Sequence, residues 1–341
     1  MGDSSIEPAV AALLSKAGFG SSGFQIQPLS ASGNNRVFTL QSGSEKMALK
    51  WYFNDAADTR DRLGTEFAFL DHAWRMGMRC VPRPIAKDPS EKLALYEFVE
   101  GEKIDASKVD ENLVQQAASF LAAINSPESR SAGTALPPAS EGCFSVADHF
   151  AMVDARLNRL EIMPVETAAE ESALELVKRI NDFWSRTKAQ LVLGCESLGL
   201  NSQTALTKSE RCLSPSDFGF HNALLRPDGS VCFIDFEYAG WDDPAKAVGD
   251  FFSHPGVAVP HAEFETFMAK VFKPFDHAEQ MAKRARLLEP IFQIKWCCII
   301  LNEFLPTAAK RRHFADPSTD VSLRKERQLL KATQLFESLK H

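Results

Sequence analysis

Three side chains that suit phosphoryl transfer lie close together in this sequence, at Asp217, Asn222 and Asp235. Asp217 and Asn222 stand five positions apart in the turn-rich segment 214–222, and Asp235 follows Asn222 by 13 residues at the end of an apolar run. In metal-assisted phosphoryl transfer, one carboxylate orients and deprotonates the attacking hydroxyl. An amide oxygen and a second carboxylate hold Mg²⁺ against the phosphates of ATP. The order acid, amide, acid therefore points to kinase chemistry.

A predicted hairpin explains how Asp235 returns to the other two groups. Residues 223–234 are mostly apolar on both sides of a Pro-Asp-Gly tripeptide, which strongly favours a turn. Pro215 and Gly219 also favour turns around Asp217. An Asp and an Asn at this spacing occur by chance in many proteins. The predicted turns and hairpin are what make the spacing of Asp217 and Asn222 significant.

A loop between two predicted strands is a candidate for phosphate binding. Residues 30–38 include Ser32, Gly33, Asn34 and Asn35. Backbone amides in such a turn can cradle phosphate oxygens, and the glycine allows a close approach. Because the loop has a single glycine, an ordinary hairpin loop is an equal alternative.

Lys50 and Glu66 complete the candidate site. Lys50 ends a predicted strand and could reach the α- and β-phosphates, provided that a carboxylate holds it in place. Glu66 borders the apolar stripe of the next predicted helix, where it could supply that carboxylate. Taken singly, each is more often a solvated surface residue. The four parts are the loop 30–38, Lys50, Glu66 and the segment from Asp217 to Asp235. Their order along the chain and their placement on strands, helix and loops agree with one another, and this joint agreement favours an ATP cleft.

These residues belong to two regions of different character. Alternating apolar and polar residues between turn-forming clusters predict antiparallel strands in the first region, and residues 85–92 are predicted to turn the chain between elements. A 3.6-residue apolar period predicts helices in the second. The predicted strands are 24–27, 36–40, 46–53 and 93–99, and the predicted helices are 60–76, 112–125, 146–162, 170–195, 262–272, 277–304 and 322–339.

The pattern predicts an α+β fold with two lobes. A small antiparallel-sheet lobe, residues 1–100, would bind the nucleotide, and a larger helical lobe, residues 101–341, would carry the catalytic hairpin and the substrate site. A chain of 341 residues is long for one core, which favours two lobes that share a cleft. Gly101 marks the expected hinge between them.

Composition excludes several classes of protein. A net charge of −7 argues against a nucleic-acid-binding surface, which would need clustered Lys and Arg. The seven cysteines are scattered, with no C-x-x-C pair, so a zinc site is not expected. Residues 1–16 lack the pattern of a signal peptide, and the longest apolar run is too short to span a membrane. We therefore expect a cytoplasmic protein; its oligomeric state is not indicated.

The motifs above resemble those of the aminoglycoside phosphotransferase and choline kinase family, small-molecule kinases with a protein-kinase-like fold. The resemblance runs from about residue 24 to 255 and is most specific in its last two segments. The segments that carry it are the loop 32–38, the strand Ala48-Leu49-Lys50, the helix with Glu66, the stretch Ser216 to Asn222 and the stretch Ile234 to Pro244.

The resemblance implies a role for each candidate residue. Asp217 would be the catalytic base, and Asn222 and Asp235 would hold Mg²⁺. Lys50 and Glu66 would position the phosphates of ATP. The segment from Glu97 through Val99 to Gly101 would be a hinge whose backbone hydrogen-bonds adenine.

One departure from the family concerns the catalytic loop. The family carries His-Gly-Asp, whereas this chain has Pro215, Ser216 and Asp217. The missing histidine buttresses the loop, so its loss affects loop geometry more than the identity of the base. Proline fixes φ and could stiffen the backbone in its place. We expect His221 to pack locally or to face phosphate, not to act as the base.

The phosphate acceptor is less well defined than the reaction. Helical sequence resumes within about ten residues of Asp235, which leaves no room for the long activation segment of a protein kinase. A small hydroxyl compound is therefore expected: an aminosugar, another sugar, an amino alcohol or a nucleoside. Acidic and aromatic side chains could hold an amine through cation–π contact, or they could be core and helix-capping residues. They are Trp241, Asp242, Asp243, Trp296 and Glu303.

Two other functions fit the same scaffold. A pseudokinase would keep the fold as a binding protein, and the altered Pro215 and Ser216 are compatible with it. The presence of all five catalytic-type residues argues against a pseudokinase. They are Lys50, Glu66, Asp217, Asn222 and Asp235. A nucleotidyl transferase would move AMP in place of phosphate, and no residue favours it.

Overall fold

The computed structural model describes residues 6–29, 35–54, 60–306 and 320–339. Ser32, Gly33 and Asn34, which were predicted to bind phosphate, lie outside these described residues. Asn35 lies inside them, at the start of the second strand.

The first half of the chain forms an antiparallel sheet in the order β1-β2-β3-β5-β4. In β3, Lys50 pairs with Val37 on one side and with Ala94 on the other, so it lies at the centre of the sheet. The strands are β1 (Gln25–Pro28), β2 (Arg36–Ser42), β3 (Glu45–Trp51), β4 (Pro84–Asp88) and β5 (Leu93–Glu97).

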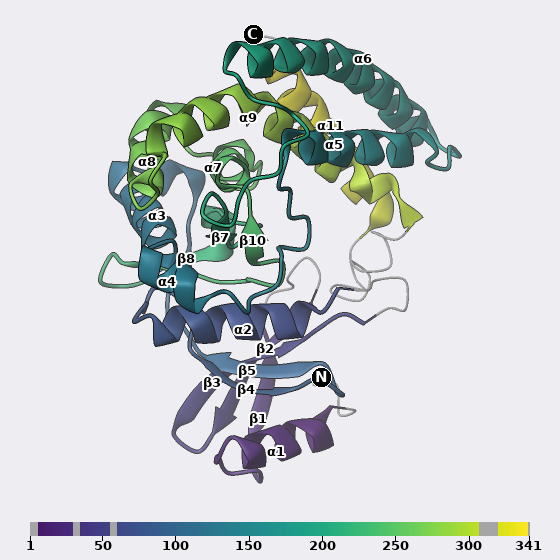
Figure 1. The fold of residues 1–341 in the computed structure, drawn as a ribbon. Coiled ribbons are helices and arrows are strands. Elements are labelled where there is room, and N and C mark those ends of the chain that lie inside the picture. Colours follow the sequence, from purple (N-terminus) through teal and green to yellow (C-terminus); the bar gives the residue numbers. More distant parts are fainter. Residues whose placement is uncertain (1–5, 30–34, 55–59, 307–319, 340–341) are drawn as a thin grey trace.

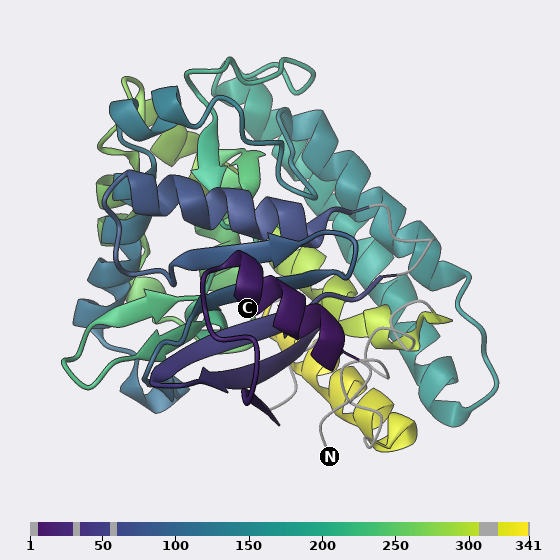
Figure 2. The ribbon, with the colours of Figure 1, turned by 90° about the horizontal axis from the view of Figure 1, so that it is seen from below.

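Two helices cover the two faces of this sheet, because successive strand residues point to opposite sides. Leu93 and Leu95 pack with α1 (Glu7–Lys16) in one apolar cluster, and Ala94 and Tyr96 belong to the main core. Helix α2 (Arg62–Arg75) lies on that second face, between the sheet and the helical half of the molecule (Figure 1). Figure 2 shows α1 lying across the outward face.

The prediction of a turn at residues 85–92 was wrong in its first half. Residues 84–88 form strand β4, and only the following residues turn the chain. Two prolines flank this segment, at 84 and 89, and they favoured a turn in the sequence. Strand β4 lies at the edge of the sheet, where a proline at the first position costs no ladder hydrogen bond.

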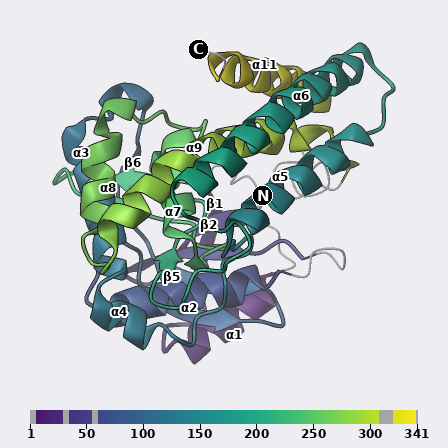
Figure 3. The ribbon, with the colours of Figure 1, turned by 45° about the horizontal axis from the view of Figure 1, so that its top comes forward.

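The second half is mostly helical and is built around α9 (Ala278–Leu301), more than half of whose residues are buried. Figure 3 shows the long helices α5, α6 and α11 gathered beside it, in agreement with their contacts. The remaining bounds are α3 (Glu111–Ile124), α4 (Pro127–Ala132), α5 (Val146–Glu161), α6 (Ala168–Ser197), α7 (Pro244–Ser253), α8 (Phe264–Phe272) and α11 (Val321–Ser338).

Short strands in this half position the candidate catalytic segments. The predicted hairpin is present as β8 (Ala223–Leu225) and β9 (Val231–Phe233), with β6 (Glu102–Lys103) paired to β8. A second pair, β7 (Cys212–Ser214) and β10 (Gly240–Asp242), brackets the catalytic loop. Both segments are therefore anchored by main-chain hydrogen bonds.

Gly101 lies where the chain passes from the sheet to the helical half. A Cβ at this position would lie 2.8 Å from the carbonyl oxygen of Leu225, so β8 approaches too closely for any larger residue. The lobe boundary near residue 100 stays a prediction, because the main apolar core draws residues from both sides of it. None of the described helices is long and apolar enough to cross a membrane.

Candidate active site

Lys50 joins the sheet to the segment after the hairpin. Its ammonium donates to Glu66 Oε2 at 2.6 Å and to Asp235 Oδ1 at 2.5 Å. Burial opposes the charge on Lys50, but the carboxylates of Asp235 and Glu66 outweigh it and raise the pKa of Lys50 well above its usual value. The structure therefore brings together three of the predicted site residues from three separate elements.

Glu66 is a fixed carboxylate and not a surface residue of α2, since only 4% of it is exposed. Its Oε2 also accepts a hydrogen bond from the Tyr52 hydroxyl at 2.6 Å, and its Oε1 accepts one from the backbone N–H of Phe236 at 3.2 Å. The second contact fixes the residue that follows Asp235. Glu66 thus orients both the lysine and the backbone of the predicted metal-binding segment.

Asp235 has an unusual backbone and an unusual acidity. Its φ is +67°, in the left-handed region that few residues other than glycine adopt. Burial raises the pKa of its carboxyl to about 7, and the charges of Glu237 and Glu66 add to this effect while Lys50 opposes it. Such strain is concentrated at functional sites, where surrounding contacts hold it in place.

Asn35 connects the strand after the predicted phosphate loop to Glu237. Its side-chain amide donates to Glu237 Oε2, and its Oδ1 accepts from the backbone N–H of Phe53 at 3.1 Å. Glu237 also lies 3.8 Å from the guanidinium of Arg62. The sequence analysis did not assign Glu237 to the site, although an acidic residue two positions after Asp235 could have suggested a second carboxylate there. Whether Asn35 contacts nucleotide stays a prediction.

The predicted catalytic loop is compact around Asp217. The side-chain amide of Asn222 donates to the backbone carbonyl of Asp217 at 3.0 Å, which leaves its own oxygen free to act as a ligand. Ser216 has a φ of +68°, again in the left-handed region. Serine thus keeps the backbone conformation that glycine, expected here from the resemblance, adopts without strain.

Two stacked histidines flank the carboxylate of Asp217. The rings of His221 and His254 are parallel within 6°, with centroids 3.4 Å apart. Their Nε2 atoms lie 3.2 Å and 3.6 Å from Asp217 Oδ1. Burial opposes the charge on Asp217, but the hydrogen bond from His221 and the nearby imidazoles and Lys295 hold the pKa of Asp217 well below its usual range. Asp217 is therefore ionised at neutral pH, as a base must be.

The cluster Asp217, His221 and His254 has the composition of a metal site, with its ligand atoms all within 4.8 Å of one another. The protonation of His254 argues against that use. Burial lowers the pKa of His254 to about 3, so its ring is neutral. Its Nδ1 accepts the backbone N–H of Gly256 at 2.9 Å, so its single proton lies on Nε2 and faces the carboxylate. Nε2 then carries a proton that faces Asp217 at 3.6 Å, and it is not a metal ligand.

The predicted adenine hinge follows β5. Glu97 is fixed by its side chain, which accepts the backbone N–H of Arg83 at 3.0 Å. Val99 makes no backbone hydrogen bond with any other described residue, so its N–H and carbonyl are available to a ligand. This is compatible with the prediction for Glu97 and Val99, which remains a prediction.

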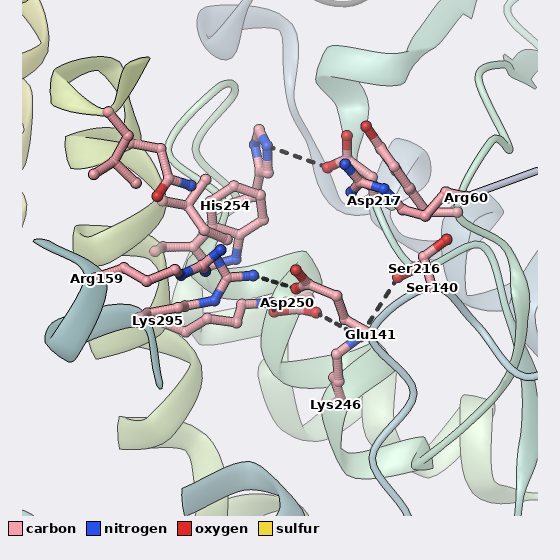
Figure 4. A pocket seen from close by; sticks show the side chains of 16 residues that line it. Arg60, Ser140, Glu141, Arg159, Ser216, Asp217, Lys246, Asp250, His254 and Lys295 are labelled. Atoms are coloured by element: carbon pink, nitrogen blue, oxygen red, sulfur yellow. Dashed lines mark hydrogen bonds and ion pairs between the residues drawn. The ribbon is translucent and has the colours of Figure 1, made fainter. Parts of the chain in front are cut away.

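A cavity of about 280 Å³ opens beside Asp217 (Figure 4). Sequence reasoning missed most of its charged lining. A partial signal was the spacing of Asp242, Lys246 and Asp250, four residues apart in turn, with one cation between two acids. In the structure Lys246 of α7 lies between the two acids, with its Nζ 2.6 Å from Asp242 at the end of β10 and 3.4 Å from Asp250 of α7.

The acidic and aromatic residues considered for an amine site have other partners. Asp243 caps α7 by accepting the N–H of Ala245, as the alternative interpretation proposed, and Glu303 pairs with Arg324. The indole N–H of Trp241 donates to the carbonyl of Gly133 at 3.1 Å. These groups are structural in the described chain.

Comparison with known sequences places this geometry in a family. A sequence model described as the phosphotransferase enzyme family matches residues 25–279. A search of curated proteins finds no match.

Solved structures of similar fold are kinases of small molecules. A choline kinase from Cryptosporidium parvum Iowa II has a TM-score of 0.61 at 12% identity, and the alignment covers 98% of this chain and 96% of that one. A choline/ethanolamine kinase family protein from Mesorhizobium loti has a TM-score of 0.59 at 16% identity, covering 99% and 95%. A spectinomycin phosphotransferase, solved with ADP and spectinomycin, has a TM-score of 0.54 at 13% identity, covering 89% and 92%. The family match and these likenesses confirm both the predicted fold class and the resemblance to the family.

Proposed function

The chain belongs to the phosphotransferase enzyme family and is an enzyme of the small-molecule kinase type; from this premise, we propose that it transfers the γ-phosphate of ATP to a hydroxyl group of a small molecule. The observation that carries the proposal is the contact of Lys50 with both Glu66 and Asp235. It joins residues 185 positions apart in sequence, and it completes a site that has a base, oxygen ligands and a phosphate-binding cation.

The residues present fit a magnesium ion. The free amide oxygen of Asn222 and the carboxylate of Asp235 are hard oxygen donors, and Mg²⁺ is usually held by one or two such groups together with substrate phosphates. When bound, the ion would offset the negative charge of the phosphates. Lys50, held by Glu66, would supply a second positive charge on the same side of the nucleotide.

Asp217 is the base in this proposal. The acceptor hydroxyl hydrogen-bonds to its ionised carboxylate, and the acceptor oxygen forms a bond to the γ-phosphorus. The bond from that phosphorus to the β–γ bridging oxygen breaks, and its electron pair leaves with ADP. The hydroxyl proton passes to Asp217 and then to solvent, which restores the carboxylate. His221 and His254 keep Asp217 oriented and ionised.

The proposal is tested by Asp217→Asn in an assay of ATP consumption with a panel of sugars, aminosugars, amino alcohols and nucleosides. Loss of the base should lower kcat by about 10²–10⁴-fold, while Mg·ATP binding is retained. Asp182→Asn is a matched control, since Asp182 is an exposed acid on α6. Near-full turnover in Asp217→Asn would remove Asp217 from this role. Silence of the wild-type chain across the panel, with Mg·ATP bound, would favour a binding protein.

A further inference from the structure

The cavity beside Asp217 is on the acceptor side of the base. Asp217 and Ser216 of the catalytic loop line it, and the rest of its wall comes largely from α5, α7 and α9. The proposed nucleotide and metal residues Lys50, Glu66, Asn222 and Asp235 are not among its lining residues. A hydroxyl compound in this cavity would therefore meet the base without displacing the nucleotide.

The described lining of this cavity is rich in positive charge. Three of its side chains are carboxylates, Glu141, Asp217 and Asp250. Five are cationic: Arg60, Arg156, Arg159, Lys246 and Lys295. Lys246 is also paired with Asp242 behind the wall, so four carboxylates in all face these five cations. A cavity lined by one excess sign of charge concentrates ligands of the other sign.

Apart from the proposed base Asp217, the carboxylates that line the cavity already form ion pairs with its cations. Glu141 pairs with Arg156, and Asp250 lies between Lys246 and Lys295. Burial lowers the pKa of Lys295 even with Asp250 beside it, and the charges of Lys246 and Arg156 add to the effect. A cationic acceptor would have to displace one of these ion pairs, whereas an anionic acceptor would relieve the repulsion among the cations.

The aromatic wall is also closed to a cation. Trp296 is 8% exposed, and the ammonium of Lys295 already lies 5.0 Å from the centroid of its ring. The edge of the His254 ring approaches the same indole, with centroids 4.1 Å apart. The ring face that would hold a quaternary amine through cation–π attraction is thus occupied.

Arg159 supplies a positive charge that the carboxylate of Glu141 favours from a distance but that no described residue pairs with directly. It is an exposed residue of α5 that lines the cavity, and it forms no hydrogen bond or ion pair with the described chain. Figure 4 shows it entering the cavity from the side opposite Asp217. A guanidinium presents paired N–H donors whose geometry matches a carboxylate or a phosphate.

We propose that the phosphate acceptor is an anionic hydroxyl compound, with its carboxylate or phosphate ester bound at Arg159 and its hydroxyl directed at Asp217. This inference rests on the proposed kinase function for the role of Asp217. Its charge preference is opposite to that expected for an amino alcohol or an aminosugar, and it narrows the sequence-based set of acceptors to acidic sugars and related hydroxy acids or phosphate esters.

The test measures binding and so does not depend on finding the natural acceptor. Calorimetric titrations of the Mg·ADP-loaded protein use four small probes: tartrate, glycerol 3-phosphate, glycerol and choline. We expect tartrate or glycerol 3-phosphate to bind, and the stronger of the two identifies the anionic group. Arg159→Gln should weaken that binding by about ten- to hundredfold, the worth of a charge-assisted hydrogen bond.

Two further variants make the result specific. Arg159→Lys keeps the charge and should retain part of the affinity, although it loses paired donation. Arg186→Gln removes an exposed arginine of α6 outside the cavity and should leave binding unchanged. Equal or tighter binding of choline or glycerol, an unaltered affinity in Arg159→Gln, or failure of both anions to bind would each overturn the inference.

Failure of the inference can be distinguished from failure of the proposed function. Anion binding should persist in Asp217→Asn, whose loss of turnover tests only the chemistry. Anion binding at Arg159 without any ATP turnover would leave the ligand class standing and refute the kinase. Turnover of a neutral or cationic acceptor, without binding of either anion, would support the kinase function and refute the proposed anionic acceptor.

Discussion

The Lys50 ammonium lies 2.5 Å from Asp235 Oδ1, so an ion pair connects the central strand of the sheet to the segment after the catalytic hairpin. In this geometry the lysine neutralises the carboxylate that is proposed to hold Mg²⁺. Arrival of Mg·ATP would supply Asp235 with a new counter-ion and Lys50 with phosphate oxygens. The pair therefore links the sheet to this segment, and under the proposed function each of its members would exchange its partner for a part of Mg·ATP.

Lys50→Met should weaken both nucleotide use and folding. Only 6% of Lys50 is exposed, and its loss leaves the carboxylates of Glu66 and Asp235 without a counter-charge. Breaking a buried ion pair by removing one partner costs about 3–5 kcal/mol of unfolding free energy. Urea unfolding measures this loss, and the KM for ATP should rise in the same variant.

A second substitution isolates the electrostatic part of that loss. Adding Asp235→Asn to Lys50→Met should restore some stability, because an amide needs no counter-charge. Lys46→Met, on an exposed residue of the same strand, is the control and should change stability little. An unchanged KM for ATP in Lys50→Met would contradict the assignment of Lys50 to the phosphates.

Ser216→Gly tests whether the left-handed conformation of the catalytic loop is strained. A residue other than glycine costs about 1–2 kcal/mol at the φ of +68° found here, and glycine loses about 0.5–1 kcal/mol of backbone entropy on folding. The balance predicts a gain of between about 0 and 1.5 kcal/mol in unfolding free energy. Ser172→Gly, in the ordinary helical backbone of α6, should instead lose stability. A clear loss in Ser216→Gly would show that the hydroxyl, which lies 3.5 Å from Lys246 Nζ, outweighs the strain.

Local sequence patterns predicted the loop and hairpin of the proposed catalytic segments, because the residues involved are close in sequence. Asp217 and Asn222 share one loop, and a Pro-Asp-Gly turn returns the chain to Asp235. Lys50 and Glu66 were placed on the right strand and helix, and their pairing was considered from the residues before the resemblance supported it. The boundaries of most long helices also agree with the 3.6-residue period, since a buried stripe is visible in sequence whatever it packs against.

The acceptor cavity could not be predicted in the same way. Arg159 and Lys295 come from α5 and α9, and an apolar stripe shows which face of each helix is buried but not which other helix it meets. His254 is similar, since it follows α7 and lies 3.6 Å from Asp217, with its ring stacked on that of His221. Charged residues in a helical sequence are usually solvated, so without tertiary structure these cations were indistinguishable from surface residues.

Glu170 should make stability depend on pH at the start of α6. Its carboxylate accepts a hydrogen bond from Lys325 of α11 at 2.6 Å and from the backbone N–H of Thr167 at 2.9 Å, as part of a capping box. The hydrogen bond from Lys325, followed by those from the backbone, lowers the pKa of Glu170 to about 2. Because the folded pKa is depressed, the stabilisation is fully present above the unfolded pKa, about 4.3, and is lost as pH falls towards 2.

Glu170→Gln should therefore lower the unfolding free energy by about 1 kcal/mol near neutral pH, the usual worth of a helix cap. The difference from wild type should shrink below about pH 4, because the wild-type carboxylate then begins to lose its charge. Urea unfolding of both proteins across this range measures it. Glu171→Gln is the matched control, since Glu171 is the exposed neighbour in the same first turn. A difference that stays constant down to the lowest measurable pH would show that the side chain acts through packing and not through its charge.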